Sequence, residues 1–128
     1  MAYEKIVEKV FSYRGYQCYV VFLPTGWRCG YVGISPEKAK NHKYGALQCH
    51  GGITYNEDIC PIPCVQASGF RWIGFDCAHF TDGTDLNSYL KYYKVLEPGH
   101  FLPLEGEIRT VEFCEKELKF IVDQLEEA

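Results

Sequence analysis

The sequence lacks the features of a membrane span, of a secreted protein and of a broad basic surface. No run approaches the roughly 18 consecutive apolar residues of a transmembrane helix, and residues 1–5 contain no apolar core of a signal peptide. Lys and Arg number 13 against 17 Asp and Glu, which gives a net charge of −4. A sequence-independent binder of duplex DNA needs a basic face. We therefore expect a cytoplasmic protein with no membrane partner and no duplex nucleic-acid partner.

The motifs of several enzyme classes are missing as well. The chain contains no P-loop, no G-x-G-x-x-G and no G-x-S-x-G, and no glycosidase-like pair of carboxylates is visible. It has few arginines (Arg14, Arg28, Arg71 and Arg109) among 10 Tyr, 8 Phe and 2 Trp. Such a set suits the stacking of a base and the clamping of phosphates. The composition favours binding over turnover, and we expect no cofactor.

The cysteines are odd in number and irregular in spacing. The chain has seven, Cys18, Cys29, Cys49, Cys60, Cys64, Cys77 and Cys114. Without a signal peptide, we expect reduced and mostly buried thiols. A zinc site drawn from Cys60/Cys64, Cys49-His50 and Cys77-x-His79 would lack the two matched knuckle pairs that such sites usually show. Small buried hydrophobic side chains are the better interpretation, and we expect no metal.

Alternation and turn signals predict an antiparallel sheet followed by a helix. The predicted strands are residues 3–13, 16–23, 27–34 and 70–76, with a further extended segment at 47–55. Arg14-Gly15 predicts a tight turn, residues 35–47 and 56–68 predict loops, and the irregular segment 77–106 has room for a short helix near 86–95. Apolar residues at spacings of three and four predict a C-terminal helix with one apolar stripe, formed by Val111, Cys114, Leu118, Ile121, Val122 and Leu125. The fold class is α+β, a single domain over 1–128: an antiparallel β-meander with a C-terminal amphipathic helix packed on it.

Two arginines are candidates for holding an anion. Strand alternation places Arg28 on the face opposite Trp27 and Cys29, flanked by glycines that would leave it accessible to a ligand, and a solvated arginine on a polar face is the alternative. Arg109 comes at the start of the C-terminal helix, where exposed amides favour anions. A phosphate would suit that position, and neutralisation by Glu107 or Glu112 is the alternative.

Two further blocks contain candidate residues. In His50-Gly51-Gly52 the paired glycines predict positive φ, close approach of another segment, or a bulge. Asp76-Cys77-x-His79 follows a strand end and could supply a nucleophile set. Residues so close in sequence rarely adopt triad geometry, however, because catalytic partners normally come from separate elements.

The order of these blocks resembles one phage and prophage family. The blocks are Arg14-Gly15-Tyr16-Gln17-Cys18, Trp27-Arg28-Cys29-Gly30-Tyr31-Val32, His50-Gly51-Gly52-Ile53-Thr54-Tyr55, Trp72-Ile73-Gly74-Phe75-Asp76-Cys77-Ala78-His79 and Ile108-Arg109-Thr110. They resemble, in collinear order over nearly the whole chain, the first-described Thoeris anti-defence proteins, which are small sponges for cyclic ADP-ribose signals.

The resemblance implies sequestration without cleavage. The ligand would be a glycosidically linked cyclic ADP-ribose made by a bacterial TIR-domain enzyme, and the protein would be a homo-oligomer, a dimer or larger. Some members also trap cyclic oligonucleotides in separate pockets. The ligand-binding residues expected on this basis are Arg28, Arg109, Thr110, Phe80, Asn87, Phe101, Asp76 and His50.

Two other functions remain open at this point. One is a small nucleotide-hydrolysing enzyme that uses His79 and Asp76 as acid and base. The other is a protein–protein inhibitor that acts through an aromatic patch.

Overall fold

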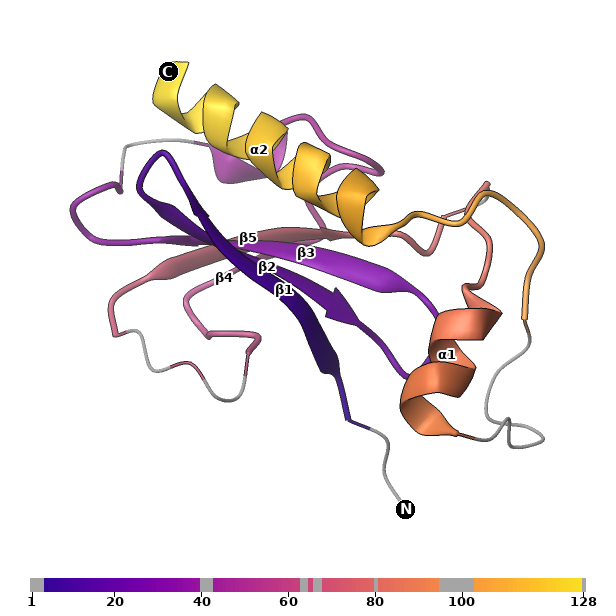
Figure 1. Ribbon diagram of the computed structural model, residues 1–128. Coiled ribbons are helices and arrows are strands. Elements are labelled where there is room, and N and C mark those ends of the chain that lie inside the picture. The colour runs from indigo at the N-terminus through magenta and orange to yellow at the C-terminus, as the bar shows by residue number, and fades with distance from the viewer. Residues whose placement is uncertain are drawn as a thin grey trace.

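The computed structural model has a five-stranded antiparallel sheet with the C-terminal helix packed across one face, which confirms the predicted α+β class (Figure 1). The structure describes residues 4–39, 43–62, 65, 68–79, 81–94 and 103–127. The elements are β1 (Ile6–Tyr13), β2 (Tyr16–Phe22), β3 (Arg28–Ile34), a 3₁₀ turn (Tyr44–Ala46), β4 (Tyr55–Glu57), β5 (Arg71–Asp76), α1 (Leu86–Tyr93) and α2 (Val111–Glu127). Among the described residues, no helix is both long enough and apolar enough to cross a membrane.

The first three strands form the predicted meander. β1 and β2 are joined by the two-residue turn Arg14-Gly15, in which both residues have positive φ (51° and 86°). That conformation matches the twist of a hairpin. β2 then pairs with β3 from Gln17 opposite Gly33 to Phe22 opposite Arg28.

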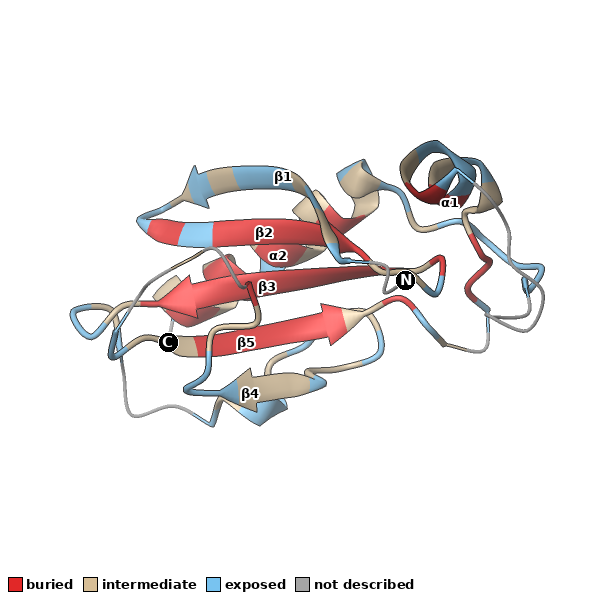
Figure 2. Ribbon diagram, turned by 90° about the horizontal axis from the view of Figure 1, so that it is seen from below, coloured by how far each residue is buried: buried red, intermediate tan, exposed pale blue. Residues whose placement is uncertain are grey.

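The sheet continues in an order that the sequence pattern did not indicate. Its strands lie in the order β1-β2-β3-β5-β4, so β5 pairs with β3 and β4 forms the edge. β5 is buried along most of its length and takes an interior position, whereas β4 has only three residues, none of them buried (Figure 2). Of the predicted extended segment 47–55, only Tyr55 lies in a strand, and β4 runs on into the predicted loop. The glycines 51 and 52 have φ of +71° and +82°, which interrupts an extended run.

The predicted α2 stripe packs on the sheet, with Val111 half-buried and its other five members buried. Cys114, Leu118, Ile121, Val122 and Leu125 are all at most 1% exposed and pack on the sheet. Gly30 in β3 lets this layer come close, because a Cβ there would lie 2.6 Å from the Phe75 ring and 3.0 Å from Leu118. The short helix predicted near 86–95 is α1, which stands at one end of the sheet (Figure 1).

The opposite face of the sheet carries a second core. Its buried members are Tyr19, Val21, Cys29, Tyr31, Ile62 and Trp72. The six cysteines that the structure describes are unpaired, and Cys18, Cys29, Cys77 and Cys114 are buried, as expected for small hydrophobic side chains. Because β3 is buried on both faces, alternate residues of one strand serve two different layers.

Candidate functional site

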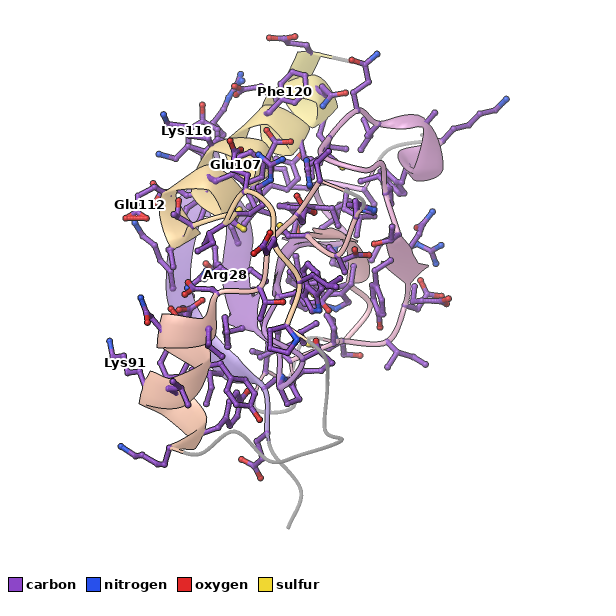
Figure 3. The ribbon with its side chains drawn as sticks, turned by 90° about the vertical axis from the view of Figure 1, so that its right-hand side faces the viewer. Arg28, Lys91, Glu107, Glu112, Lys116 and Phe120 are labelled. Atoms are coloured by element: carbon purple, nitrogen blue, oxygen red, sulfur yellow. The ribbon has the colours of Figure 1, made fainter. Side chains whose placement is uncertain are left out.

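The two candidate arginines meet at the end of the sheet between the helices. Arg28 is the first residue of β3, and Arg109 lies two residues before α2 begins. The Arg28 Nη1 group donates to the Arg109 carbonyl at 3.1 Å. Figure 3 shows Arg28 between the start of α2 and α1, with Glu107 above it. Residues that are 81 positions apart are thus in direct contact.

Arg28 is buried rather than accessible, so the prediction of an open strand cation is wrong, and so is the solvated alternative. It is 5% exposed. Its five N–H groups all donate: two to Glu8, and one each to Asp85, Ser88 and the Arg109 carbonyl, at 2.6–3.1 Å. Burial lowers the pKa of Arg28, but the hydrogen bonds to the two carboxylates outweigh it and raise the pKa above its ordinary value. Every donor is therefore occupied by the protein itself.

A bulge in β1 explains why Glu8 reaches Arg28. Val7 pairs with Val21 and Lys9 pairs with Val20, so Glu8 is an extra residue in the ladder. A bulge re-aims a side chain, here turning a carboxylate inward from an edge strand. The Glu8 side chain is only 5% exposed. Asp85, the N-cap of α1, supplies the second carboxylate and also accepts from the Ser88 N–H.

Arg109 is bound differently, because it retains a solvent-facing side. Its Nε donates to Asp82 at 2.6 Å, Nη1 pairs with Glu107, and Nη2 lies 3.4 Å from the Thr81 hydroxyl. The guanidinium also lies 5.0 Å from the centre of the Phe113 ring. The Asp82 side chain is fully buried, whereas that of Glu107 is 70% exposed. Asp82 therefore anchors Arg109, and Glu107 is a neutralising partner at the surface, as one alternative had it.

Two crossing chain segments hold these acids in place. Asp82 and Glu107 form an isolated parallel bridge, and the Gly83 N–H donates to the Glu107 carbonyl at 2.8 Å. A Cβ at Gly83 would lie 2.4 Å from the Gly106 carbonyl oxygen. The backbones can cross this closely only because neither residue has a side chain.

His50 joins the same cluster through Asp82. Its Nε2 lies 2.9 and 3.0 Å from the two Asp82 oxygens, and its backbone N–H donates to Glu117 of α2 at 2.7 Å. The imidazole packs edge-on against Phe113 and His79, with ring centres 5.2 and 5.3 Å away. Burial raises the pKa of Asp82, but hydrogen bonds from Arg109 and His50 outweigh it and hold the pKa below its ordinary value.

The paired glycines after His50 behave as predicted. Both have positive φ, and Gly51 also lies close to another segment: a Cβ there would be 1.9 Å from His79 Nε2. Gly52 has nothing within 4 Å of the same position. Gly51 therefore lets His79 lie beside His50.

The other expected site residues are distributed unevenly. Thr110 is the N-cap of α2, and its hydroxyl accepts from the Phe113 N–H at 3.1 Å. Asn87 is exposed in the first turn of α1, next to a partner of Arg28. Phe80 and Phe101 lie outside the described residues.

Asp76 lies away from the arginines, in a hollow on the opposite face of the sheet. It pairs across the ladder with Cys29, the neighbour of Arg28 on β3, so it faces the other layer. The hollow has a volume of about 620 Å³. It is lined by Leu23, Thr25, Trp27, Cys29, Tyr31, Thr54, Tyr55, Phe75, Asp76, Ala78 and His79.

The structure gives no support to a thiol nucleophile at Cys77. Its sulfur lies 3.8 Å from that of Cys114, and this contact together with burial raises the pKa of Cys77 well above its ordinary value. A thiol with a raised pKa is a poor nucleophile. Among the described residues, no group of three or more His, Cys, Asp and Glu side chains could hold a metal ion.

The acids that organise this site were missed by the sequence reasoning. Asp82, Glu8 and Asp85 are separated from their arginine partners by 27, 20 and 57 residues. The signal for Asp82 was its place in Thr81-Asp82-Gly83, an acid before a glycine inside the irregular segment. Glu8 carried no signal, since an acid in an edge strand ordinarily faces water.

Comparison of the chain with protein-family models, with curated proteins and with solved structures finds no match. The site must therefore be interpreted from its own chemistry. Two arginines lie among four carboxylates (Glu8, Asp82, Asp85 and Glu107), and of these carboxylates Glu107 is the most exposed.

Proposed function

We propose that this protein binds and sequesters a cyclic ADP-ribose signal without cleaving it, as a phage anti-defence protein in the cytoplasm of an infected bacterium. The observation that carries the proposal is the state of Arg109: Asp82 holds its Nε from the buried side, while only the exposed Glu107 pairs with Nη1. A preorganised guanidinium of this kind matches the bidentate geometry of a phosphate.

The start of α2 supports an anion at the same place. The helix has 17 residues, and its Thr110 cap occupies the Phe113 N–H. The N–H groups of the first two helical residues, Val111 and Glu112, come before the first intrahelical bond and remain available to a ligand. Together with Arg109 they would meet a pyrophosphate from one side.

The role of Arg28 in this proposal is to position Arg109 rather than to contact the ligand. All five of its donors are bonded, and one of them fixes the Arg109 carbonyl. His50 lies beside Asp82, and Asn87 is exposed on α1 next to Ser88, which accepts from Arg28. The adenine would stack on aromatic side chains, which contribute about 1–3 kcal/mol per base.

A homo-oligomer would enclose the ligand better than one copy does. Large apolar side chains remain exposed along α2 and the segment before it, namely Leu104, Ile108 and Phe120, each 45–50% exposed. Leu104 and Ile108 belong to the segment that carries Arg109, and exposed apolar groups beside a candidate site favour burial against a second copy. Nanomolar sequestration corresponds to about −12 kcal/mol, which favours an enclosed pocket.

The test is capture followed by release. The protein is incubated with the TIR-derived cyclic ADP-ribose and filtered, the retained fraction is boiled, and both fractions are analysed by HPLC. Sequestration predicts ligand missing from the filtrate and recovered intact after boiling. Ligand that stays in the filtrate would refute the proposal.

Carboxylate-to-amide variants test the site in two opposite directions. Glu107→Gln removes the competitor for Arg109 and should strengthen capture, whereas Asp82→Asn loosens the anchor and should weaken it. Arg109→Ala removes two charge-assisted hydrogen bonds, about 1.5–3 kcal/mol each, and should weaken capture on the order of 100-fold or more. Lys116→Ala removes an exposed cation of α2 and serves as the control that should change nothing.

One contact favours hydrolysis as a second candidate function. His79 Nε2 lies 3.4 Å from Asp76 Oδ1, and both side chains line the hollow. The same HPLC experiment separates the two functions, since an enzyme would return altered ligand with more than one turnover per site. His79→Ala should then stop product formation without stopping binding.

A further inference from the structure

We propose that the hollow on the far face of the sheet is a binding site for a small organic cation of the alkylammonium class. It lies apart from the two arginines, because Cys29, Tyr31 and Asp76, which line it, face away from α2. Of its other lining residues, His79 contacts His50 of the arginine site. Its volume of about 620 Å³ falls within the range of small-molecule sites, roughly 300–1,000 Å³.

Aromatic rings form the walls of this hollow. The rings of Tyr31 and Tyr55 are nearly perpendicular, with an interplanar angle of 79° and centres 5.5 Å apart, and Trp27 lines the same space. A cation is attracted to the face of such rings, most strongly to tryptophan. Three aromatic side chains therefore line the space that a guest would occupy.

Contacts within the protein hold the rings of Tyr55 and Tyr31 in place without a ligand. The Tyr55 hydroxyl donates to the Ile59 carbonyl, which fixes the ring at the sheet edge. Gly74 makes room for the Tyr31 ring to lie across β5, since a Cβ there would be 2.5 Å from that ring. Preorganised walls spare a ligand the cost of ordering them.

The charge of the hollow selects a cation and opposes an anion. Asp76 contributes a carboxylate, and none of the described residues that line the hollow is Lys or Arg. The Asp76 Oδ1 accepts from the Ala78 N–H at 3.0 Å, so the carboxylate is oriented by the backbone. His79 also lines the hollow, with its Nε2 3.4 Å from Asp76 Oδ1, so an imidazole is the one basic side chain among the described lining residues. A carboxylate among aromatic rings, with no Lys or Arg among the described lining residues, favours a cationic guest over the anionic ligand proposed above.

The experiment compares choline with its uncharged isostere 3,3-dimethyl-1-butanol, titrated against the whole protein. Of the two tryptophans, Trp72 is 1% exposed, so a Trp72→Phe background makes Trp27 the fluorescent reporter of the hollow. Choline should bind with Kd on the order of 1 mM or below and change the fluorescence, while the isostere should bind at least about tenfold more weakly. Calorimetry on the unsubstituted protein provides a second readout.

Matched variants identify the groups responsible. Asp76→Asn should weaken choline binding about tenfold or more, whereas Asp58→Asn, which changes a carboxylate that is 83% exposed and outside the hollow, should not. Tyr55→Leu should weaken binding, and Tyr55→Phe should restore most of it because the ring face is kept. Circular dichroism of each variant confirms that it is folded.

Three outcomes would overturn the proposal: equal affinity for choline and the isostere, unchanged affinity in both Asp76→Asn and Tyr55→Leu, or no binding of choline at about 50 mM, far above the millimolar Kd expected for so small a ligand. A lysine tripeptide amide compared with n-butylammonium distinguishes a partner's side chain from a free amine, and tight binding of either supports the cation site. The Arg109→Ala variant should bind choline normally, so this site can fail or succeed independently of nucleotide capture.

Discussion

Replacing Arg28 should unfold the end of the sheet rather than simply empty a ligand site. The Arg28→Ala substitution leaves Glu8 and Asp85 without their cation, and these side chains are only 5% and 15% exposed. Breaking a buried ion pair by removing one partner costs about 3–5 kcal/mol. A domain of this size has about 5–15 kcal/mol in total, so between a fifth and all of its stability should be lost.

Urea denaturation and thermal melting measure this loss. At about 3–5 °C per kcal/mol for a chain of this length, the Tm should fall by about 10–25 °C. The Tm of Arg28→Lys should fall less than that of Arg28→Ala, because a lysine keeps the charge. It should still fall, because a lysine cannot supply five donors in a plane. Combining Arg28→Ala with Glu8→Gln should cost less than the sum of the two single substitutions, because the double variant leaves one buried charge fewer.

A loss below about 1 kcal/mol for Arg28→Ala would refute this reasoning, since exposed ion pairs are worth about that much. Such a result would indicate that Arg28 is accessible to solvent, as the glycines near it in the sequence predicted. The expected instability also has a practical consequence. Loss of ligand capture in an Arg28 variant does not identify a ligand contact unless the fold is shown to be intact.

Three other predictions test the residues that hold the site in place. Thr110→Ala should lower stability by about 1 kcal/mol, because it removes the N-cap hydrogen bond of α2, and urea denaturation measures it. Gly52→Ala should cost about 1 kcal/mol for its positive φ alone, whereas Gly51→Ala should cost clearly more, because its Cβ would also displace His79; equal losses would contradict the close contact. The pKa of Asp82 is held below its ordinary value of 3.8 in the folded protein, so its stabilising contribution is present above about pH 4 and is lost as the pH falls through the lowered pKa. Melting temperatures measured from pH 6 to pH 2 should fall less in Asp82→Asn than in the unsubstituted protein.

The elements that could be predicted from the sequence are those specified by local pattern. The hairpin at Arg14-Gly15 needs two residues with positive φ, and the α2 stripe needs only its spacing of three and four. The sheet order could not be predicted in the same way. It depends on β5 being apolar on both faces while β4 is short and polar, a comparison between strands rather than a property of either one.

The ion pairs of the site could not be predicted from the sequence. The prediction chose Arg28 and Arg109 correctly as neighbours of one region but assigned Arg28 an open position. One extra residue in β1 explains why Arg28 is buried, because the bulge at Glu8 turns that carboxylate toward the start of β3. A bulge of one residue leaves no mark in a pattern of alternation, and it exchanges an exposed cation for a buried pair.

The alternation along β3 explains how one short strand contributes to two separate sites. Arg28 faces the layer beneath α2, while Trp27 before it and Cys29 after it line the hollow on the other side. Between them, a continuous set of contacts runs around the sheet end, from Asp76 to His79, then to His50, Asp82 and Arg109. Within this set the two imidazoles, whose ring centres are 5.3 Å apart, link the hollow to the arginine site. Because Gly51 leaves room for the edge-on contact of the two imidazoles, its replacement should disturb both the anionic and the cationic ligand, whereas replacement of Gly52 should disturb neither.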